Sequence, residues 1–426
     1  MKLKTTKSLW GMLAVLAFSA CSSNSDEGSG QQFWTVTLQA SMDDATSRAL
    51  SEGASNVITA SFAVNDEVVV VDADGSTIVG ILRADAAGVN TTLKGSLNVA
   101  SLANGEVVTL RYRSATATYD GQVGTLAGIS TGQDYAEGTL TVSTKSPLTF
   151  TADNVTLSAK QSITKFSFTA GGNSVNVETF GIAATGLVQS IATNATEAVG
   201  PVTGTLATAS ADVYVALRNN SGEKQTYSFM VKGGDGHWYT GTKKANLENG
   251  KNYTASVTLT QLPALTNESA EGTIGVVGNL PAIVVNFSGT KKAVALMNVG
   301  ALCPEAYGSY YTFANRASGL SNGWYVPEQL ELGALVAKSN AWGAQNGVNG
   351  RTFTIGSNSL FFPAGGLDDG DNVPADLWQV SVLGYYWSSL SASDTMAYCL
   401  SFGSSSISTL SDYKIDGLSI RPFHAL

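Results

Sequence analysis

The chain has 426 residues, of which 43% are hydrophobic and 13% are charged, and its formal net charge is −9 at pH 7. This length predicts two or three domains, and the 45 glycines with few charges are typical of a rigid, β-rich exported protein. The acidic balance argues against a nucleic-acid partner, because binding to phosphates needs clustered Lys and Arg.

The first 20 residues predict export. Lys2, Lys4 and Lys7 precede an apolar run at 9–18 that is too short to span a bilayer. The run leads into Ser-Ala-Cys at Cys21, which resembles the signal of bacterial lipoproteins. That resemblance implies that Cys21 is acylated and becomes the first mature residue. The alternative is an ordinary signal peptide followed by an unrelated cysteine.

Two β domains are expected next. Residues 22–32 are rich in Ser, Asn, Gly and Gln, and they predict a flexible tether. A first β domain is expected over 33–147, where short alternating or apolar runs such as 68–71 are separated by Gly, Asn and Asp. A second β domain is expected over 148–262, and it ends in a strand with alternating apolar residues at 253–259.

Residues 263–290 read as a linker, although the apolar run 283–287 is also compatible with a strand of the last domain. A helix is predicted after Pro327, because proline suits the first helical turn. Its apolar side chains at one face are expected to be Leu330, Ala334 and Ala337. Alternation in Tyr398-Cys399-Leu400-Ser401-Phe402 predicts a half-buried strand. Core packing is the expected role of the aromatic residues Trp324, Trp387 and Phe423.

Four blocks in this last region occur in a characteristic order. They are Gly323-Trp324-Tyr325-Val326-Pro327, Gly384-Tyr385-Tyr386-Trp387-Ser388-Ser389, Ala397-Tyr398-Cys399-Leu400-Ser401-Phe402 and Arg421-Pro422. The series resembles the C-type-lectin-like modules of the major paralogous lipoprotein domain of Bacteroidetes and Fibrobacter. The resemblance implies an α+β module over 291–426.

A second resemblance covers the β domains. Thr46-Ser47-Arg48-Ala49, then Phe62-Ala63-Val64-Asn65-Asp66, and the closing Gly250-Lys251-Asn252-Tyr253 resemble blocks of fimbrillin-family (Mfa-like) subunits. The family implies two tandem β-sandwich domains. It also implies proteolysis after a basic residue, here Arg48, and replacement of the removed strand by one from another subunit. The alternative is that Arg48 is an ordinary exposed arginine.

Two cysteines remain within the last module. Cys303 and Cys399 form an even pair in an exported domain, which favours a disulfide, with two buried free thiols as the alternative. Neither histidine, His237 or His424, has a Cys or His at zinc-ligand spacing, so no metal or cofactor is expected. Ser388 has no nearby histidine for a triad, and the cysteine spacing does not fit a formylglycine-generating enzyme, so no catalysis is expected.

Two polar segments of the last module are candidates for ligand binding. One is the loop at 364–376, with Asp368, Asp369 and Asp371, and the other is an expected loop at 403–414, with Asp412 and Tyr413. Short polar residues with an occasional aromatic suit adaptable recognition. The acidic loop alternatively binds Ca²⁺ through carboxylates or is a solvated turn.

Together these features predict a mainly β protein with two fimbrillin-like β-sandwiches and a C-type-lectin-like α+β module. The expected function is a surface-exposed tip or accessory subunit of a type V-like pilus, anchored in the outer membrane by lipid. Its partners would be other fimbrial subunits through strand donation, and a host glycan or protein. The alternative is a lipoprotein that captures such ligands without polymerising.

Overall fold

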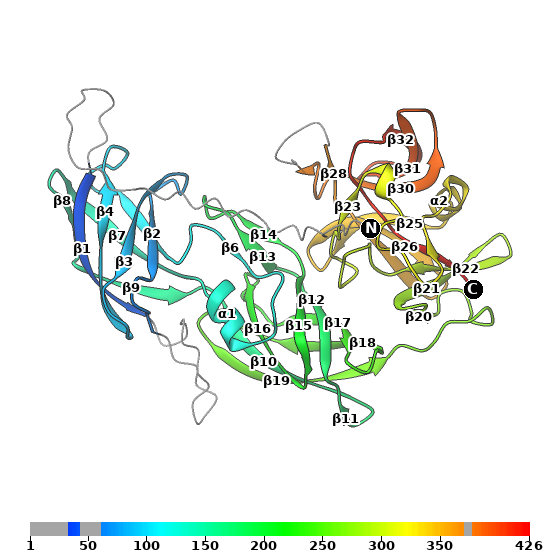
Figure 1. Cartoon of the computed structure of the whole chain (residues 1–426), viewed down its shortest axis with the longest axis horizontal. Coiled ribbons are helices and arrows are strands. Elements are labelled where there is room, and N and C mark those ends of the chain that lie inside the picture. Colours follow the sequence, from blue (N-terminus) through cyan, green and yellow to red (C-terminus); the bar gives the residue numbers. More distant parts are fainter. Residues whose placement is uncertain (1–32, 43–60, 370–376) are drawn as a thin grey trace, which may run out of the picture.

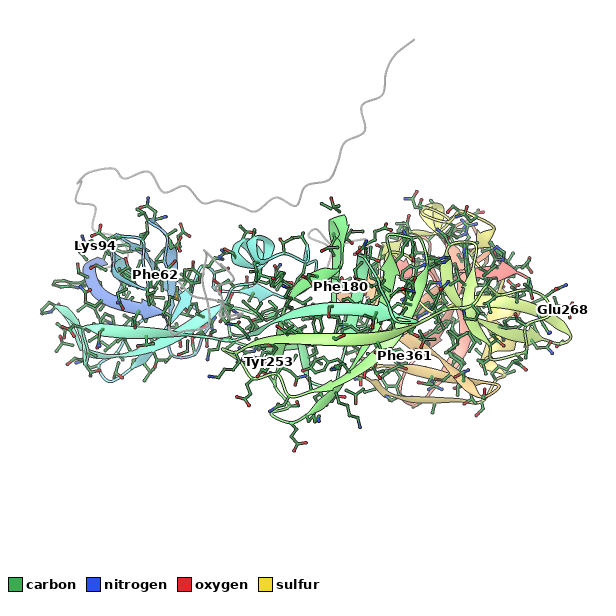
Figure 2. The ribbon with its side chains drawn as sticks, turned by 90° about the horizontal axis from the view of Figure 1, so that it is seen from below. Phe62, Lys94, Phe180, Tyr253, Glu268 and Phe361 are labelled. Atoms are coloured by element: carbon green, nitrogen blue, oxygen red, sulfur yellow. The ribbon has the colours of Figure 1, made fainter. Side chains whose placement is uncertain are left out.

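The computed structural model describes residues 33–42, 61–369 and 377–426, so the predicted signal, tether, Cys21 and Arg48 lie outside the described residues. It shows three units along an elongated molecule (Figure 1). Figure 2 shows the same order from a second side, with Phe62 in the first unit, Tyr253 in the second and Glu268 in the third. No helix among the described residues has the length and apolar character needed to cross a bilayer.

The first unit is a closed β barrel. Its strands are β1 (Phe33–Met42), β2 (Glu67–Val71), β3 (Ile78–Ala84), β4 (Asn90–Asn98), β5 (Val107–Tyr112), β7 (Ala136–Lys145), β8 (Leu148–Phe150) and β9 (Asn154–Ala159). They pair in the order β5-β2-β3-β4-β1-β9-β7, and β5 also pairs with β7, which closes the ring. Closure removes the free sheet edges that would otherwise invite pairing with other chains.

The second unit is built on a long, twisted sheet. Its elements are β6 (Ala117–Thr118), α1 (Leu126–Gly132), β10 (Ser162–Ala170), β11 (Asn173–Ser174), β12 (Val177–Ala183), β13 (Leu187–Ile191), β14 (Glu197–Val199), β15 (Val202–Ser210), β16 (Asp212–Asn219), β17 (Gln225–Gly233), β18 (Trp238–Ala245) and β19 (Asn252–Gln261). The first strand after the barrel, β10, runs parallel to the last strand, β19. The barrel has the same feature, because its first strand β1 runs parallel to its last strand β9.

These pairings correct the domain boundary predicted at 147/148. Strands β8 and β9 belong to the first sheet, and the second unit begins at β10. The segment from β6 to Tyr135 instead joins the second unit, because Tyr119, Ile129 and Tyr135 lie in its core. The assignment of these segments to the two units depends on contacts between residues far apart in the chain, which local sequence patterns do not reveal.

The third unit mixes four sheets and two short helices. Its elements are β20 (Ile274–Val277), β21 (Leu280–Phe287), β22 (Thr290–Ala295), β23 (Tyr310–Tyr311), η1 (Phe313–Asn315), β24 (Trp324–Tyr325), α2 (Gln329–Val336), β25 (Asn340–Gln345), β26 (Val348–Ile355), β27 (Asn358–Pro363), β28 (Leu367–Asp368), β29 (Leu377–Trp378), β30 (Gly384–Ser391), β31 (Met396–Phe402), β32 (Ile407–Tyr413), β33 (Leu418–Ser419) and β34 (Phe423–Ala425). The predicted linker at 263–290 is therefore largely structured, and β21 contributes the buried Ile283 and Val285. The last strand, β34, lies between β22 and β24.

Local predictions in this unit have mixed outcomes. The helix forms with a capping box between Glu328 and Glu331, but it buries Leu332 and Leu335, and Leu330 is 78% exposed. Strand β31 is buried on both faces rather than one. Leu400 belongs to a hydrophobic cluster with Tyr386 on one face, and Cys399 belongs to a second cluster with Trp387 on the other. The aromatic residues Trp324, Trp387 and Phe423 are buried as predicted.

Candidate functional site

Strand β1 occupies a complete slot in the wall of the barrel. It pairs antiparallel with β4 from Phe33 to Ser41 and parallel with β9 from Gln39 to Met42. Alternate side chains point into the barrel and are buried in its core; they are Val36, Leu38, Ala40 and Met42. Burial of each larger apolar side chain is worth about 1.5–3 kcal/mol, so β1 contributes a large share of the stability of the first unit.

Both walls of the slot contact β1. Leu38 faces the buried Leu93 of β4, and Val36 faces Gly95 of the same strand. On the β9 side, the hydroxyls of Ser41 and Thr156 lie 3.1 Å apart. Strand β1 is therefore held by backbone pairing on both edges and by the burial of its inward side chains.

The chain re-enters the barrel after β1 through Phe62, which is 1% exposed and packs edge-on against Tyr112. The Tyr112 hydroxyl donates a 2.6 Å hydrogen bond to buried Asp66. Between Met42 and Phe62 runs the segment 43–60, which contains Arg48 in the sequence and lies outside the described residues. That segment is the only covalent link between β1 and the rest of the barrel.

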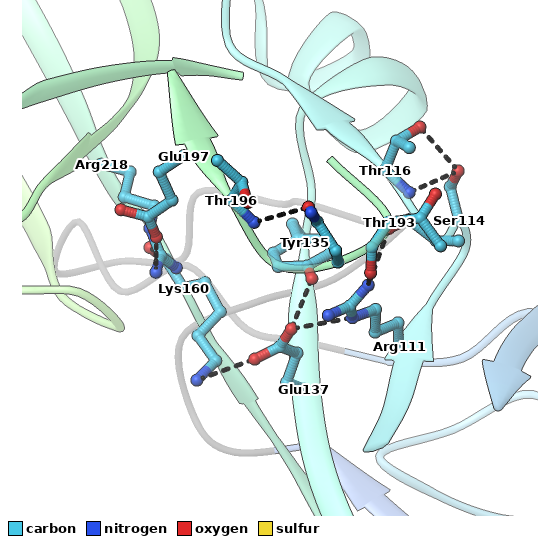
Figure 3. A network of polar contacts seen from close by, with 12 residues as sticks. Arg111, Ser114, Thr116, Tyr135, Glu137, Lys160, Thr193, Thr196, Glu197 and Arg218 are labelled. Carbon is cyan, nitrogen blue, oxygen red and sulfur yellow. Dashed lines mark hydrogen bonds and ion pairs between the residues drawn. The ribbon is translucent and has the colours of Figure 1, made fainter. Parts of the chain in front are cut away.

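A polar network joins the slot to the second unit (Figure 3). Glu137 of β7 accepts a 3.0 Å hydrogen bond from Nε of Arg111 and another from the Tyr135 hydroxyl. Its second oxygen lies 3.1 Å from Nζ of Lys160, which follows β9. The Arg111 guanidinium also donates to the carbonyl oxygens of Ala115 and Thr193, so it connects the barrel to the β13–β14 hairpin.

This network makes the junction sensitive to acid. Burial alone would raise the pKa of Glu137, but the hydrogen bond from Tyr135 and the charges of Lys160 and Arg111 outweigh it and lower the pKa below its ordinary value of 4.5. The stabilisation is complete above about pH 4.5 and is lost as the pH falls through the folded-state pKa. We expect calorimetric scans to show this loss as a melting temperature that falls as the pH is lowered below about 4.5. Glu137→Gln should remove this component of the pH dependence, and an unchanged acid profile would contradict the assignment.

The predicted ligand residues lie at one end of the third unit. Asp368 ends β28, where its backbone forms an antiparallel bridge with Gly417, and Asp369 follows it. Asp371 lies outside the described residues. The predicted loop at 403–414 is wrong in its conformation, because Asp412 and Tyr413 belong to the edge strand β32. Tyr413 is 58% exposed.

This end also carries an exposed tryptophan that was not among the predicted ligand residues. Trp378 of β29 is 51% exposed, and its neighbour Leu377 is 50% exposed. Trp378 pairs with Leu367 across the β28–β29 hairpin. The one available signal was an apolar Leu-Trp pair directly after the acidic loop, outside any alternating pattern. Exposed tryptophan is a frequent anchor of binding surfaces because it offers a large, rigid contact area.

Three tyrosine hydroxyls hold the base of this hairpin. Tyr386 donates to the Pro363 carbonyl at 2.7 Å, Tyr310 donates to the Gly365 carbonyl, and the Tyr307 hydroxyl lies 3.0 Å from Oγ of Ser381. Desolvation raises the pKa of all three tyrosines, so the hydroxyls stay protonated and keep these contacts. The two ends of the hairpin are therefore held to the rest of the third unit by these contacts.

Among the described residues, no three His, Cys, Asp or Glu side chains gather in a group that could hold a metal ion. The predicted disulfide is not formed, and Cys303 and Cys399 are both buried free thiols. The reason is their placement in different clusters. Cys303 packs at the junction with the second unit, where a Cβ on Gly181 would lie 2.6 Å from the Cys303 Cβ. Cys399 pairs with Trp387 in the other cluster.

The third unit is packed on the second. Met230 and Trp238 share a hydrophobic cluster with Leu262 and Met297. Nε1 of Trp238 donates a 3.0 Å hydrogen bond to the Asn279 carbonyl. The end of β19 is thus fixed between the two units and continues directly into the third.

No protein-family model matches this sequence, and no curated protein matches it. Among solved structures, a proposed cell adhesion protein from Bacteroides ovatus aligns over 54% of this chain and 96% of its own, with 17% identity and a TM-score of 0.31. A fimbrial assembly protein from Parabacteroides distasonis aligns over 53% and 90%, with 13% identity and a TM-score of 0.27. The tip fimbrial protein Mfa3 from Porphyromonas gingivalis aligns over 56% and 97%, with 10% identity and a TM-score of 0.27.

Proposed function

We propose that this chain is a cell-surface fimbrial tip or accessory subunit that accepts a strand from a neighbouring subunit and presents its third unit for adhesion. The observation that carries the proposal is the position of β1, which fills a two-sided slot and is tethered through the segment 43–60 alone. Cleavage after Arg48 would free β1 covalently, and the slot would then take an extended strand of another chain. This extends to the chain the fimbrial and adhesive roles of the solved proteins named above.

The tip position is supported by strands that are already in use. β19 lies between β10 and β18, and its end is held against the third unit through Leu262. β34 lies between β22 and β24, and its Phe423 is fully buried and stacked on Phe287. Neither strand can be donated without unfolding a core, so the chain accepts a strand more readily than it gives one.

Anchoring and location complete the proposal. Acylation of Cys21 would hold the uncleaved protein in the outer membrane, and cleavage after Arg48 would release it into a filament. Electron microscopy with an antibody against residues 290–426 tests this arrangement. Labelling at filament ends is expected, and labelling confined to filament-free membrane would favour the alternative, a lipoprotein that captures ligands without polymerising.

The adhesive surface is proposed at the end of the third unit that carries Trp378, Asp368 and Asp369, together with Asp412 and Tyr413 of β32. Trp378→Ala is expected to weaken binding to a host glycan or host-cell surface by about 2 kcal/mol or more, which is roughly 30-fold, because an anchoring aromatic is lost. Asp412→Ala combined with Tyr413→Ala should weaken the same binding.

Binding is measured on a glycan array and on host cells, with the uncleaved full chain. Leu330→Ala is the matched control, because Leu330 is as exposed as any large apolar side chain of this unit but lies on α2. Unchanged binding in both ligand-face variants, on a surface that the wild type binds, would reject this end of the molecule as the adhesive face.

A further inference from the structure

One wall of the slot is held by few strand contacts. β9 pairs with β1 through Asn154–Leu157, and with β7 only at Ala136–Ala159 and Glu137–Ser158. When β1 leaves, the first four residues of β9 lose their strand partner. Without β1, this part of β9 would collapse onto the exposed apolar core unless contacts with other strands keep it in place.

Glu137 lies at the end of β9 that stays paired. It binds Lys160 directly after β9, while Arg111 and Tyr135 hold its other oxygen (Figure 3). Arg111 is 2% exposed and is the register partner of Glu137 on β5. The carboxylate therefore joins three consecutive strands of the ring, β5, β7 and β9, and none of these contacts involves β1.

The middle of β9 also lies very close to β7, at Gly138. A Cβ built on Gly138 would lie 2.5 Å from the carbonyl oxygen of Thr156 and 2.6 Å from Cγ2 of Val155. Contacts this short do not occur for real side chains, so only glycine allows β9 to lie so close to β7 at this point. This close approach is also independent of β1.

The second unit fixes the far end of the same wall. The carbonyl of Lys160 accepts a 3.2 Å hydrogen bond from Arg218, which is paired with Glu197. The next residue, Gln161, is 1% exposed, and its side chain accepts from the Tyr119 hydroxyl and donates to Asp134. Lys160 is thus held by its side chain from the barrel and by its carbonyl from the second unit.

We propose that Glu137 is a positioning residue for strand exchange: through Lys160 it keeps β9 in place when β1 leaves, so that the emptied slot remains open to an incoming strand. The inference rests on the proposed function, because it concerns the same slot. The contacts of Glu137 would then do more than hold the first and second units together, because they would also hold β9 in place after β1 has left. A linkage alone would affect the stability of the intact chain, whereas a positioning role affects the emptied slot most.

The experiment uses the full chain with a site for a specific protease inserted within residues 43–60. After cutting, a fluorescent peptide with the sequence of residues 31–43 is added in excess, and its uptake is followed by anisotropy. The wild type is expected to take up the peptide. Glu137→Gln and Lys160→Ala should each weaken uptake at equilibrium by about tenfold or more, and Gly138→Ala should do so without changing any charge.

Two controls separate positioning from general damage. Lys160→Arg keeps the charge pair and should retain uptake close to that of the wild type. Lys232→Ala removes an ion pair with Glu178 of similar length in the second unit, away from the slot, and should have no effect. The melting temperature of each uncut variant shows whether the barrel still folds with β1 in place.

Peptide uptake separates strand exchange from the positioning role of Glu137. Absence of peptide uptake by the wild type would overturn strand exchange itself, and with it the proposed function. Uptake by the wild type that Glu137→Gln and Lys160→Ala leave unchanged would overturn the positioning role alone. If uncut Glu137→Gln fails to fold, Lys160→Ala decides, because the Lys160 side chain is 32% exposed and its loss leaves a smaller defect.

Discussion

Replacement of Trp387 by alanine is expected to unfold the third unit, with a loss of about 3–5 kcal/mol in the free energy of unfolding. Trp387 is fully buried, and its ring packs edge-on against Phe313 at a centroid distance of 5.6 Å. Its Nε1 donates a 2.6 Å hydrogen bond to the carbonyl of Tyr311. Alanine would leave a large cavity and would remove the donor from a partly buried carbonyl, and both effects destabilise.

The chain offers a matched control for this change. Trp378→Ala removes the same side chain from an exposed position in the same unit, so its effect on stability should stay within about 0.5 kcal/mol. Urea unfolding followed by tryptophan fluorescence measures both variants. Similar midpoints for Trp387→Ala and the wild type would show that the third unit does not depend on this core.

Removal of β1 is the second change with a large expected effect. A chain that begins at Ala49 lacks the inward residues Val36, Leu38 and Met42, each of which is worth about 1.5–3 kcal/mol when buried. The total approaches the entire stability of a typical domain, so the first unit should lose most of its stability and expose its core at the emptied slot. The second unit should keep its fold, because β10 to β19 form their own sheet and core.

A peptide with the sequence of residues 31–43 should restore the first unit of the shortened chain. Circular dichroism melting measures the restoration, and a peptide with Leu38→Asp is the control. That peptide should fail, because the charge would be placed opposite the buried Leu93. A shortened chain that is as stable as the full one without any peptide would contradict the role given to β1.

Strand alternation made the β class and several elements predictable from the sequence. The run Val68–Val71 is buried on both faces as its composition indicates, because Val68 and Val70 enter the barrel core while Val69 and Val71 are covered beside Ala115. The helix after Pro327 also forms, but the choice of its buried face failed. Leu330 lies on the exposed face, and the sheet contacts of Leu332 and Leu335 decide the orientation.

The remaining misses come from contacts that no local pattern records. The parallel pairing of β1 with β9 joins residues more than 100 positions apart, so the boundary at 147/148 was placed before two strands that complete the barrel. The residues of β32 do not predict a strand, because this edge strand is rich in Ser and Thr and lacks an alternation of buried apolar residues. The family resemblance predicted that a strand is replaced after cleavage. The strands that flank β1, the contacts of Glu137 and the exposure of Trp378 could be identified only from the structure.

The central claim is that β1 can be replaced by a strand from another chain. Native mass spectrometry tests it most directly, on the full chain cut within residues 43–60 and mixed with an isotope-labelled peptide of residues 31–43. The account predicts that the segment carrying β1 is lost and that one labelled peptide takes its place, while the mass of the remaining chain is unchanged. Retention of the original segment under a large excess of peptide, with no labelled complex after prolonged incubation, would contradict it.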